Sequence, residues 1–172
     1  RAPPAAAEPG VTAIQTLPEL AGPVLVIAPH MDDESLGCGL LLAGHLRKEG
    51  LHLLFATDGS HSPEPTAGAP EAVRRQLALT REQEAREAMA VLGVPAGNVT
   101  FLAFEDGTLA TCKGALRASL VEHIGRVGAS AVLVPSRCAE DLYAGWWRLI
   151  AQLGAVPRVL VWDGEAAVGR WR

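Results

Sequence analysis

The sequence has no run of about 18 consecutive apolar residues, so no segment has the length of an apolar membrane-spanning helix. It also lacks a basic excess, because 15 Lys and Arg stand against 19 Asp and Glu and the net charge is −4. Non-specific nucleic-acid binding needs a basic surface, and the composition argues against that partner. The opening stretch RAPPAAAEPG lacks the apolar core of a signal peptide, and we expect residues 1–21 to form a flexible lead-in.

Cysteine is scarce as well. The three cysteines, Cys38, Cys112 and Cys138, are odd in number and far apart in the sequence. This pattern favours free thiols in a reducing, cytoplasmic compartment over a disulfide framework or a zinc finger. The 172 residues, 49% of them hydrophobic, are enough for one domain with a sizeable core. We expect that domain to span residues 22–172.

Apolar runs and helical patterns alternate along the chain. Short apolar runs without polar alternation indicate strands buried on both faces of a sheet, and they occupy residues 24–28, 51–59, 98–104, 130–136 and 158–162. Helical spacing and stop signals fall between them, at residues 35–49, 71–93, 113–128 and 142–154. This order predicts an α/β fold, a Rossmann-like and mostly parallel sheet with helices on both faces.

Polar segments follow the predicted strands. PHMDDE comes after the first strand, TDGSHS after the second, EDG after the third and SRCAED after the fourth. In open parallel sheets the functional site lies outside the carboxyl ends of the strands. The sequence therefore predicts that these four segments meet at one edge of the sheet.

The first of these segments carries the most specific chemistry. His30 and Asp33 lie three residues apart on a tight turn and can converge on one cation, and Zn²⁺ accepts that mixture of nitrogen and oxygen ligands. Asp32 is then left beside the metal, where a carboxylate can take a proton from water. A helix N-terminus bearing acidic residues is the alternative reading. It accounts for Asp33 and Glu34 and explains His30 less well, because His30 follows Pro29 at the end of the predicted strand.

The segment PHMDDESLGCG resembles the AHPDDE-type signature of the PIG-L/LmbE family of zinc-dependent N-acetylglucosaminyl deacetylases. FATDGS resembles the TDG segment of that family, TREQEAREAMAVLGV resembles its Arg-x-x-Glu helix, and FLAFEDGTL resembles its PDG segment. Together these motifs cover residues 22–135 in the order of the family. The resemblance implies that His30 and Asp33 bind Zn²⁺ and that Asp32 is the general base. It also implies that Arg81 and Asp106 hold the sugar.

The sequence departs from the family after the fourth predicted strand. Family members usually carry a His-x-Asp-His segment there, whose last histidine completes the metal site and whose first stabilises the oxyanion. Aligned on Asp141, this chain has Ala139 and Leu142 at the two histidine positions. Three explanations stay open. A residue such as His61 or Asp141 replaces the ligand, the site binds a sugar without cleaving it, or the chain is not continuous around residues 135–143.

The sequence thus predicts a metal-dependent hydrolase that removes an acetyl or other acyl group from an N-acetylated amino sugar or its conjugate. Its partner would be that small molecule, and its metal Zn²⁺. A family member that binds a carbohydrate without turnover is the alternative. A Mg²⁺-dependent phosphoryl-transfer enzyme is a third possibility, although no phosphate-cradling glycine-rich loop accompanies the acidic segment. The sugar, its aglycone and the oligomeric state are left open.

Overall fold

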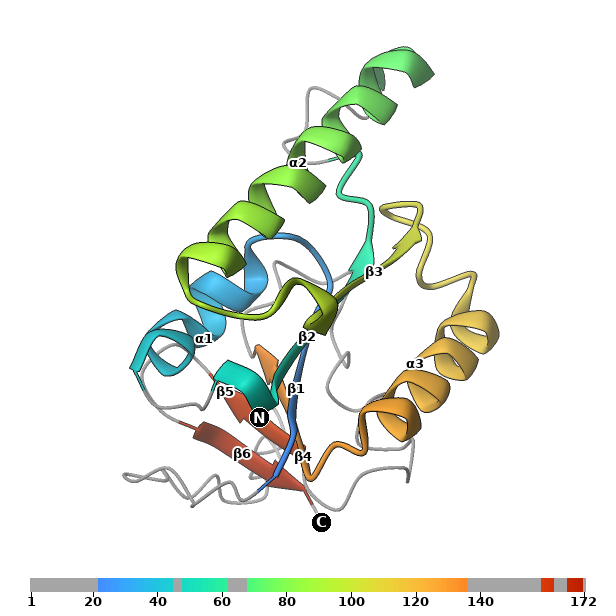
Figure 1. The fold of residues 1–172 in the computed structure, drawn as a ribbon. Coiled ribbons are helices and arrows are strands. Elements are labelled where there is room, and N and C mark those ends of the chain that lie inside the picture. The colour runs from blue at the N-terminus through green and yellow to red at the C-terminus, as the bar shows by residue number, and fades with distance from the viewer. Residues whose placement is uncertain (1–21, 45–47, 62–67, 136–158, 163–166, 172) are drawn as a thin grey trace, which may run out of the picture.

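A computed structural model describes residues 22–44, 48–61, 68–135, 159–162 and 167–171 (Figure 1). Strands and helices alternate through most of this part, as β1 (Val24–Ala28), α1 (Asp33–Gly44), β2 (Leu51–Thr57), α2 (Glu71–Val91), β3 (Val99–Phe104), α3 (Lys113–Val127), β4 (Ala131–Pro135), β5 (Val159–Trp162) and β6 (Ala167–Trp171). Two short 3₁₀ turns, η1 (Lys48–Gly50) and η3 (Ala96–Asn98), precede β2 and β3. The predicted lead-in and the predicted helix over 142–154 lie outside the described residues.

The strands form one six-stranded sheet in the order β3-β2-β1-β4-β5-β6. The pairings from β3 to β5 are parallel, and β6 runs antiparallel to β5. The order reverses between β1 and β4, which are neighbours in the sheet but distant in sequence. Ligands of open α/β sheets bind at such a switch point. The mostly parallel Rossmann-like sheet predicted from the sequence is confirmed.

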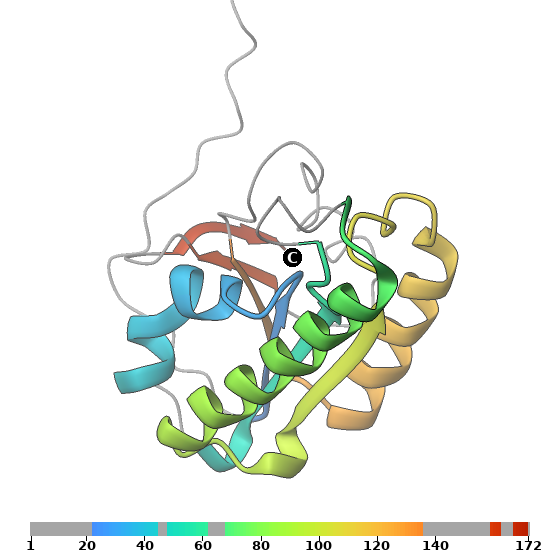
Figure 2. The same cartoon turned by 90° about the horizontal axis from the view of Figure 1, so that it is seen from above.

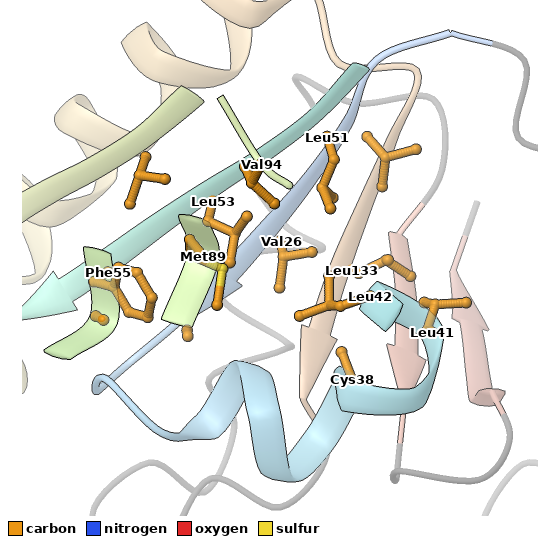
Figure 3. Close-up of a cluster of buried hydrophobic side chains, with 14 residues drawn as sticks. Val26, Cys38, Leu41, Leu42, Leu51, Leu53, Phe55, Met89, Val94 and Leu133 are labelled. Carbon is orange, nitrogen blue, oxygen red and sulfur yellow. The ribbon is translucent and has the colours of Figure 1, made fainter. Parts of the chain in front are cut away.

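Helices cover both faces of the sheet, with α1 and α2 on one side and α3 on the other (Figures 1 and 2). Under α1 and α2, Val26 pairs in register with Leu53, and Leu42 and Met89 pack over them (Figure 3). Cys38 belongs to the same cluster, and burial raises the pKa of its thiol to about 12. It therefore acts as a small apolar residue, as the core of a close-packed sheet requires.

The second face is filled by the residues that alternate with the first set. Successive side chains of a strand point to opposite faces, so Ile27 and Leu54 pack against Leu120 and Ile124 of α3. The helix ends at Gly128, whose φ of 64° gives the left-handed C-cap that glycine adopts without strain. No described helix is long and apolar enough to cross a membrane.

The edge strand β3 carries an irregularity just before its polar loop. The β2–β3 register shifts between Phe55 and Thr57, where one extra β3 residue is accommodated. Ala103 lies at this point with a φ of 53°, and it is the one non-glycine residue with positive φ in the described part of the chain. Such a bulge redirects the strand end, and strained backbone of this kind is commonly found at functional sites.

The packing of α3 predicts a large effect of truncating its central residue. Leu120 is 0% exposed, so Leu120→Ala should lower the free energy of unfolding by roughly 2–5 kcal/mol through lost burial and a residual cavity. The control is Leu79→Ala on α2, where the side chain is 56% exposed and the expected change is below about 0.5 kcal/mol. Urea denaturation measures both. Equal effects of the two substitutions would contradict this packing.

Candidate metal centre

The turn between β1 and α1 is hydrogen-bonded to the neighbouring strand β2 at Pro29, just before the candidate site residues begin. The carbonyl of Pro29 accepts a hydrogen bond from the backbone N–H of Thr57 at 2.9 Å and from its hydroxyl at 2.8 Å. The carbonyl of Asp32 accepts the N–H groups of Ser35 and Leu36, which starts α1. The intervening residues, His30 among them, are therefore held between a buried strand end and a helix start.

His30 and Asp33 face each other across this turn. The backbone N–H of His30 donates to Oδ2 of Asp33 at 3.0 Å, and Nδ1 of the imidazole lies 3.5 Å from the same oxygen. Asp33 is 2% exposed and begins α1, where the helix dipole stabilises a carboxylate. Asp32 is exposed, and ligand atoms of His30, Asp32 and Asp33 all lie within 4.8 Å of one another.

This arrangement fits a metal ion. Two ligands bonded at about 2.0–2.1 Å to a tetrahedral Zn²⁺ lie roughly 3.3 Å apart. The 3.5 Å between Nδ1 of His30 and Oδ2 of Asp33 is close to that spacing. A mixture of imidazole nitrogen and carboxylate oxygen also suits zinc better than Mg²⁺, which prefers oxygen ligands. The residues at this turn can therefore hold zinc.

The second nitrogen of His30 is bound to another carboxylate. Nε2 of the ring donates to Oδ1 of Asp106 at 2.8 Å. Burial alone would lower the pKa of His30, but its hydrogen bonds and charge interactions with Asp106 and Asp33 outweigh burial and raise that pKa to about 9. Burial likewise favours a higher pKa for Asp106, and the bond and charge of His30 overcome it, so the pKa is lowered. At neutral pH a metal must therefore displace the proton on Nδ1.

Asp106 is in turn fixed by the loop that follows β2. Oδ1 of Asp58 accepts the backbone N–H of Asp106 at 3.1 Å and that of Ser60 at 3.0 Å. The backbone N–H of His61 donates to Oδ2 of Asp106 at 3.3 Å, and Nδ1 of its ring donates to the Asp106 carbonyl at 2.8 Å. The loops after β2 and β3 thus form one hydrogen-bonded unit around the carboxylate that contacts His30.

Arg81 reaches the other acidic residue of the turn from α2. Its guanidinium donates to Oδ2 of Asp32 at 3.1 Å and to the carbonyl of Met31 at 3.2 Å. Gly59 provides the space for this side chain, because a Cβ at that position would lie 3.1 Å from Nε of Arg81 and 3.3 Å from Cε of Met31. Gly59 also has a φ of +62°, in the left-handed region that favours glycine.

The protein family of this chain follows from its match to a known family model. Residues 25–141 match the family model described as PIG-L: GlcNAc-PI de-N-acetylase. The chain belongs to this family. The family assigned from the sequence motifs is therefore confirmed. No match to a curated protein was found.

Solved structures of low sequence identity share the fold of this PIG-L family chain. N,N'-diacetylchitobiose deacetylase from Pyrococcus horikoshii is 18% identical with a TM-score of 0.64, covering 81% of this chain and 59% of its own. The 4-carboxy-2-hydroxymuconate hydratase GalB from Pseudomonas putida is 19% identical with a TM-score of 0.65, covering 82% and 65%. A deacetylase of teicoplanin biosynthesis, in complex with teicoplanin, is 17% identical with a TM-score of 0.58, covering 81% and 68%.

The chain spans less than two thirds of the length of the first two of these structures. At such identities the likeness establishes the fold of the PIG-L family chain. A zinc-inhibited form of teicoplanin deacetylase also shares this fold, at 18% identity and a TM-score of 0.50. The neighbours thus include deacetylases and one hydratase.

The structure places all of the site residues predicted from the sequence at the carboxyl edge of the sheet, namely His30, Asp32, Asp33, Arg81 and Asp106. Their individual roles remain predictions. His61, considered as a replacement ligand, binds the backbone and carboxylate of Asp106, and it is not among the three grouped ligand-type residues found in the described part of the chain. The positions of Ala139 and Leu142 lie outside the described residues.

Two contributors were not singled out from the sequence of this PIG-L family chain. Asp58 and Gly59 lie within the TDG segment, and their position after β2 was the available signal. The sequence identifies Glu34 only as an acidic residue at the start of a helix. It is 2% exposed, Ser35 donates to its Oε1 at 2.7 Å, and burial raises its pKa. Its Oε2 has no hydrogen-bond partner among the described atoms.

A pocket of about 200 Å³ lies beside the candidate metal centre, between α2 and the ends of β2 and β3. The residues that line it include Met31, Asp58, Leu79 and Phe101. None of the three grouped ligand-type residues lines this pocket. It borders the site but does not contain it.

The space occupied by Arg81 predicts a penalty at Gly59. Gly59→Ala should lower the free energy of unfolding by about 1–2 kcal/mol, because the left-handed backbone strains an L-residue and the new methyl group crowds Arg81. Gly97→Ala is the matched control, because a Cβ there would meet nothing within 4 Å and φ is not in the strained region. Its expected change is below about 0.5 kcal/mol. Denaturant titration measures the free energy of unfolding of both variants. Indistinguishable free energies would contradict the close approach at Gly59.

Proposed function

We propose that this PIG-L family chain carries out metal-dependent hydrolysis of the acetyl or other acyl group of an N-acetylated amino-sugar conjugate. One observation carries the proposal. His30 and Asp33 present a zinc-compatible pair of ligand atoms while the exposed carboxylate of Asp32 lies within 4.8 Å of them. The family description, GlcNAc-PI de-N-acetylase, and the deacetylases among the structural neighbours support the same reaction class.

The roles of the residues follow from their surroundings. His30 and Asp33 would hold the ion, which when bound supplies Lewis-acid chemistry by acidifying water and polarising a carbonyl. Asp32 would take the proton from the attacking water and give it to the leaving amine, as a general base and then a general acid. Its side chain is 49% exposed, so water and substrate can reach it.

Arg81 would position this base. Its bond engages Oδ2 of Asp32, and the charge-assisted contact fixes the orientation of a carboxylate that is otherwise exposed. Oδ1 of Asp32 can then accept the proton. The predicted contact of Arg81 with sugar hydroxyls remains part of the proposal, and the resemblance to the family supports it.

The proposal also requires a third ligand for the zinc ion, besides His30 and Asp33. Catalytic zinc sites usually have three protein ligands. Asp32 is the one further ligand-type residue that the described part of the chain brings close to both His30 and Asp33. At the two family histidine positions the sequence has Ala139 and Leu142. Because of this departure from the family sequence, the binding of an amino-sugar conjugate without turnover is kept as the second candidate function.

Metal binding can be tested without any substrate. At 100-fold excess over its dissociation constant, Zn²⁺ should stabilise the chelator-treated protein by about 2.7 kcal/mol. For a chain of this size the melting temperature should then rise by roughly 5–11 °C. His30→Ala should abolish this rise, while His52→Ala, on β2 and outside the site, should retain it. A rise with Mg²⁺ in place of Zn²⁺ would contradict the zinc assignment and favour phosphoryl transfer.

Catalysis is tested by amine release from N-acetylglucosamine conjugates by the zinc-loaded protein. Asp32→Asn should lower kcat by roughly 10²–10⁴-fold, because the variant cannot accept the proton, while zinc stoichiometry is unchanged. Glu87→Gln on the exposed side of α2 is the control and should retain activity. Saturable sugar binding without amine release would establish the second candidate instead.

Because one structural neighbour is a hydratase, 4-carboxy-2-hydroxymuconate belongs in the substrate panel, and turnover of that compound alone would overturn the deacetylase proposal.

A further inference from the structure

Asp106 is a buried carboxylate whose two oxygens both accept hydrogen bonds from protein groups. The residue is 5% exposed, and its carboxylate points to protein groups on both sides. Oδ1 accepts from Nε2 of His30 at 2.8 Å, and Oδ2 accepts from the backbone N–H of His61 at 3.3 Å.

We infer that Asp106 is a positioning residue that fixes the tautomer and orientation of His30 for metal binding. This inference rests on the metal site of the proposed function. A carboxylate that accepts the Nε2–H of an imidazole leaves Nδ1 as the nitrogen that can bind a metal once its proton is displaced. In this structure Nδ1 is the nitrogen that faces Oδ2 of Asp33, at 3.5 Å.

The orientation of the His30 ring is thereby determined by contacts at both of its nitrogens. Asp33 lies on the Nδ1 side and begins α1, while Asp106 lies on the Nε2 side and follows β3. Carboxylates that hydrogen-bond the far nitrogen of a metal-ligating histidine raise its basicity and hold the ring in place. Asp106 has the burial, distance and atom pairing that this task requires.

Asp106 is itself immobilised, which a positioning residue must be. Its backbone N–H is held by Oδ1 of Asp58, and its carbonyl by the ring of His61. The positive φ of Ala103 and the adjoining register shift lie just before this loop. The loops after three adjacent strands therefore converge on His30 and together fix the orientation of its ring.

The test separates metal affinity from substrate affinity. Zinc dissociation constants are measured by competition with a chromophoric chelator, in the absence of substrate, for the full chain and for Asp106→Ala and Asp106→Asn. We expect Asp106→Ala to weaken zinc binding by roughly 10–100-fold, as loss of such a partner does elsewhere. Asp106→Asn should weaken it less, because the amide oxygen can still accept from Nε2. Glu105→Gln, an exposed neighbour in the same loop, should leave it unchanged.

Kinetics provide the second readout. KM for an N-acetylglucosamine conjugate is measured for both Asp106 variants with zinc held at saturation. An increased KM with unchanged zinc affinity would show that Asp106 holds the sugar and would overturn the inference. Should the alanine variant fail to fold by circular dichroism, the asparagine variant carries the same comparison.

Failure of the inference is distinguishable from failure of the proposed function. Wild-type zinc binding without amine release would refute the hydrolase, while the chelator competition would still decide the role of Asp106. Zinc binding that the Asp106 substitutions leave unchanged would refute the inference alone. A wild-type chain that binds no zinc would refute both.

Discussion

The site depends on one interaction, the placement of the His30 ring between two carboxylates. Asp33 lies 3.5 Å from Nδ1, and Asp106 accepts from Nε2 at 2.8 Å. The two carboxylates come from different loops, so neither can fix the ring unless the ends of β1 and β3 are held in place across β2. The hydrogen bonds from Thr57 to Pro29 meet that condition on one side of β2. The contacts of the β2 loop with Asp106 meet it on the other.

The sheet supplies the rigidity behind these contacts. Its central strands are buried on both faces, and two separate apolar clusters clamp them between α1 and α2 on one side and α3 on the other. The polar residues of the site therefore lie at the carboxyl edge of the sheet, close to the switch between β1 and β4. Open α/β sheets bind their ligands at this position. The ring of His30 and the carboxylates of Asp33 and Asp106 can be accommodated there because they are specific partners of one another, which offsets the cost of burial.

Local patterns were sufficient to predict much of this fold and site. Buried strands read as continuous apolar runs, and the spacing of His30 and Asp33 on one turn is visible without any tertiary contact. The antiparallel strand β6 was not predicted, since its short sequence AVGRW can be identified as a strand only from its pairing with β5. The bond between His30 and Asp106 joins residues 76 positions apart, so sequence motifs could place both at one edge but not reveal that they touch. The positive φ of Ala103 was equally invisible, because alanine gives no signal of a bulge.

A crystal structure of the zinc-loaded protein, with anomalous difference maps on either side of the zinc absorption edge, tests the central claim most directly. The account predicts one anomalous peak bonded to Nδ1 of His30 and to Asp33, with Nε2 of the same ring still bonded to Asp106. A peak on Nε2, with Asp106 turned away from the ring, would contradict it, as would zinc bound only elsewhere in the chain.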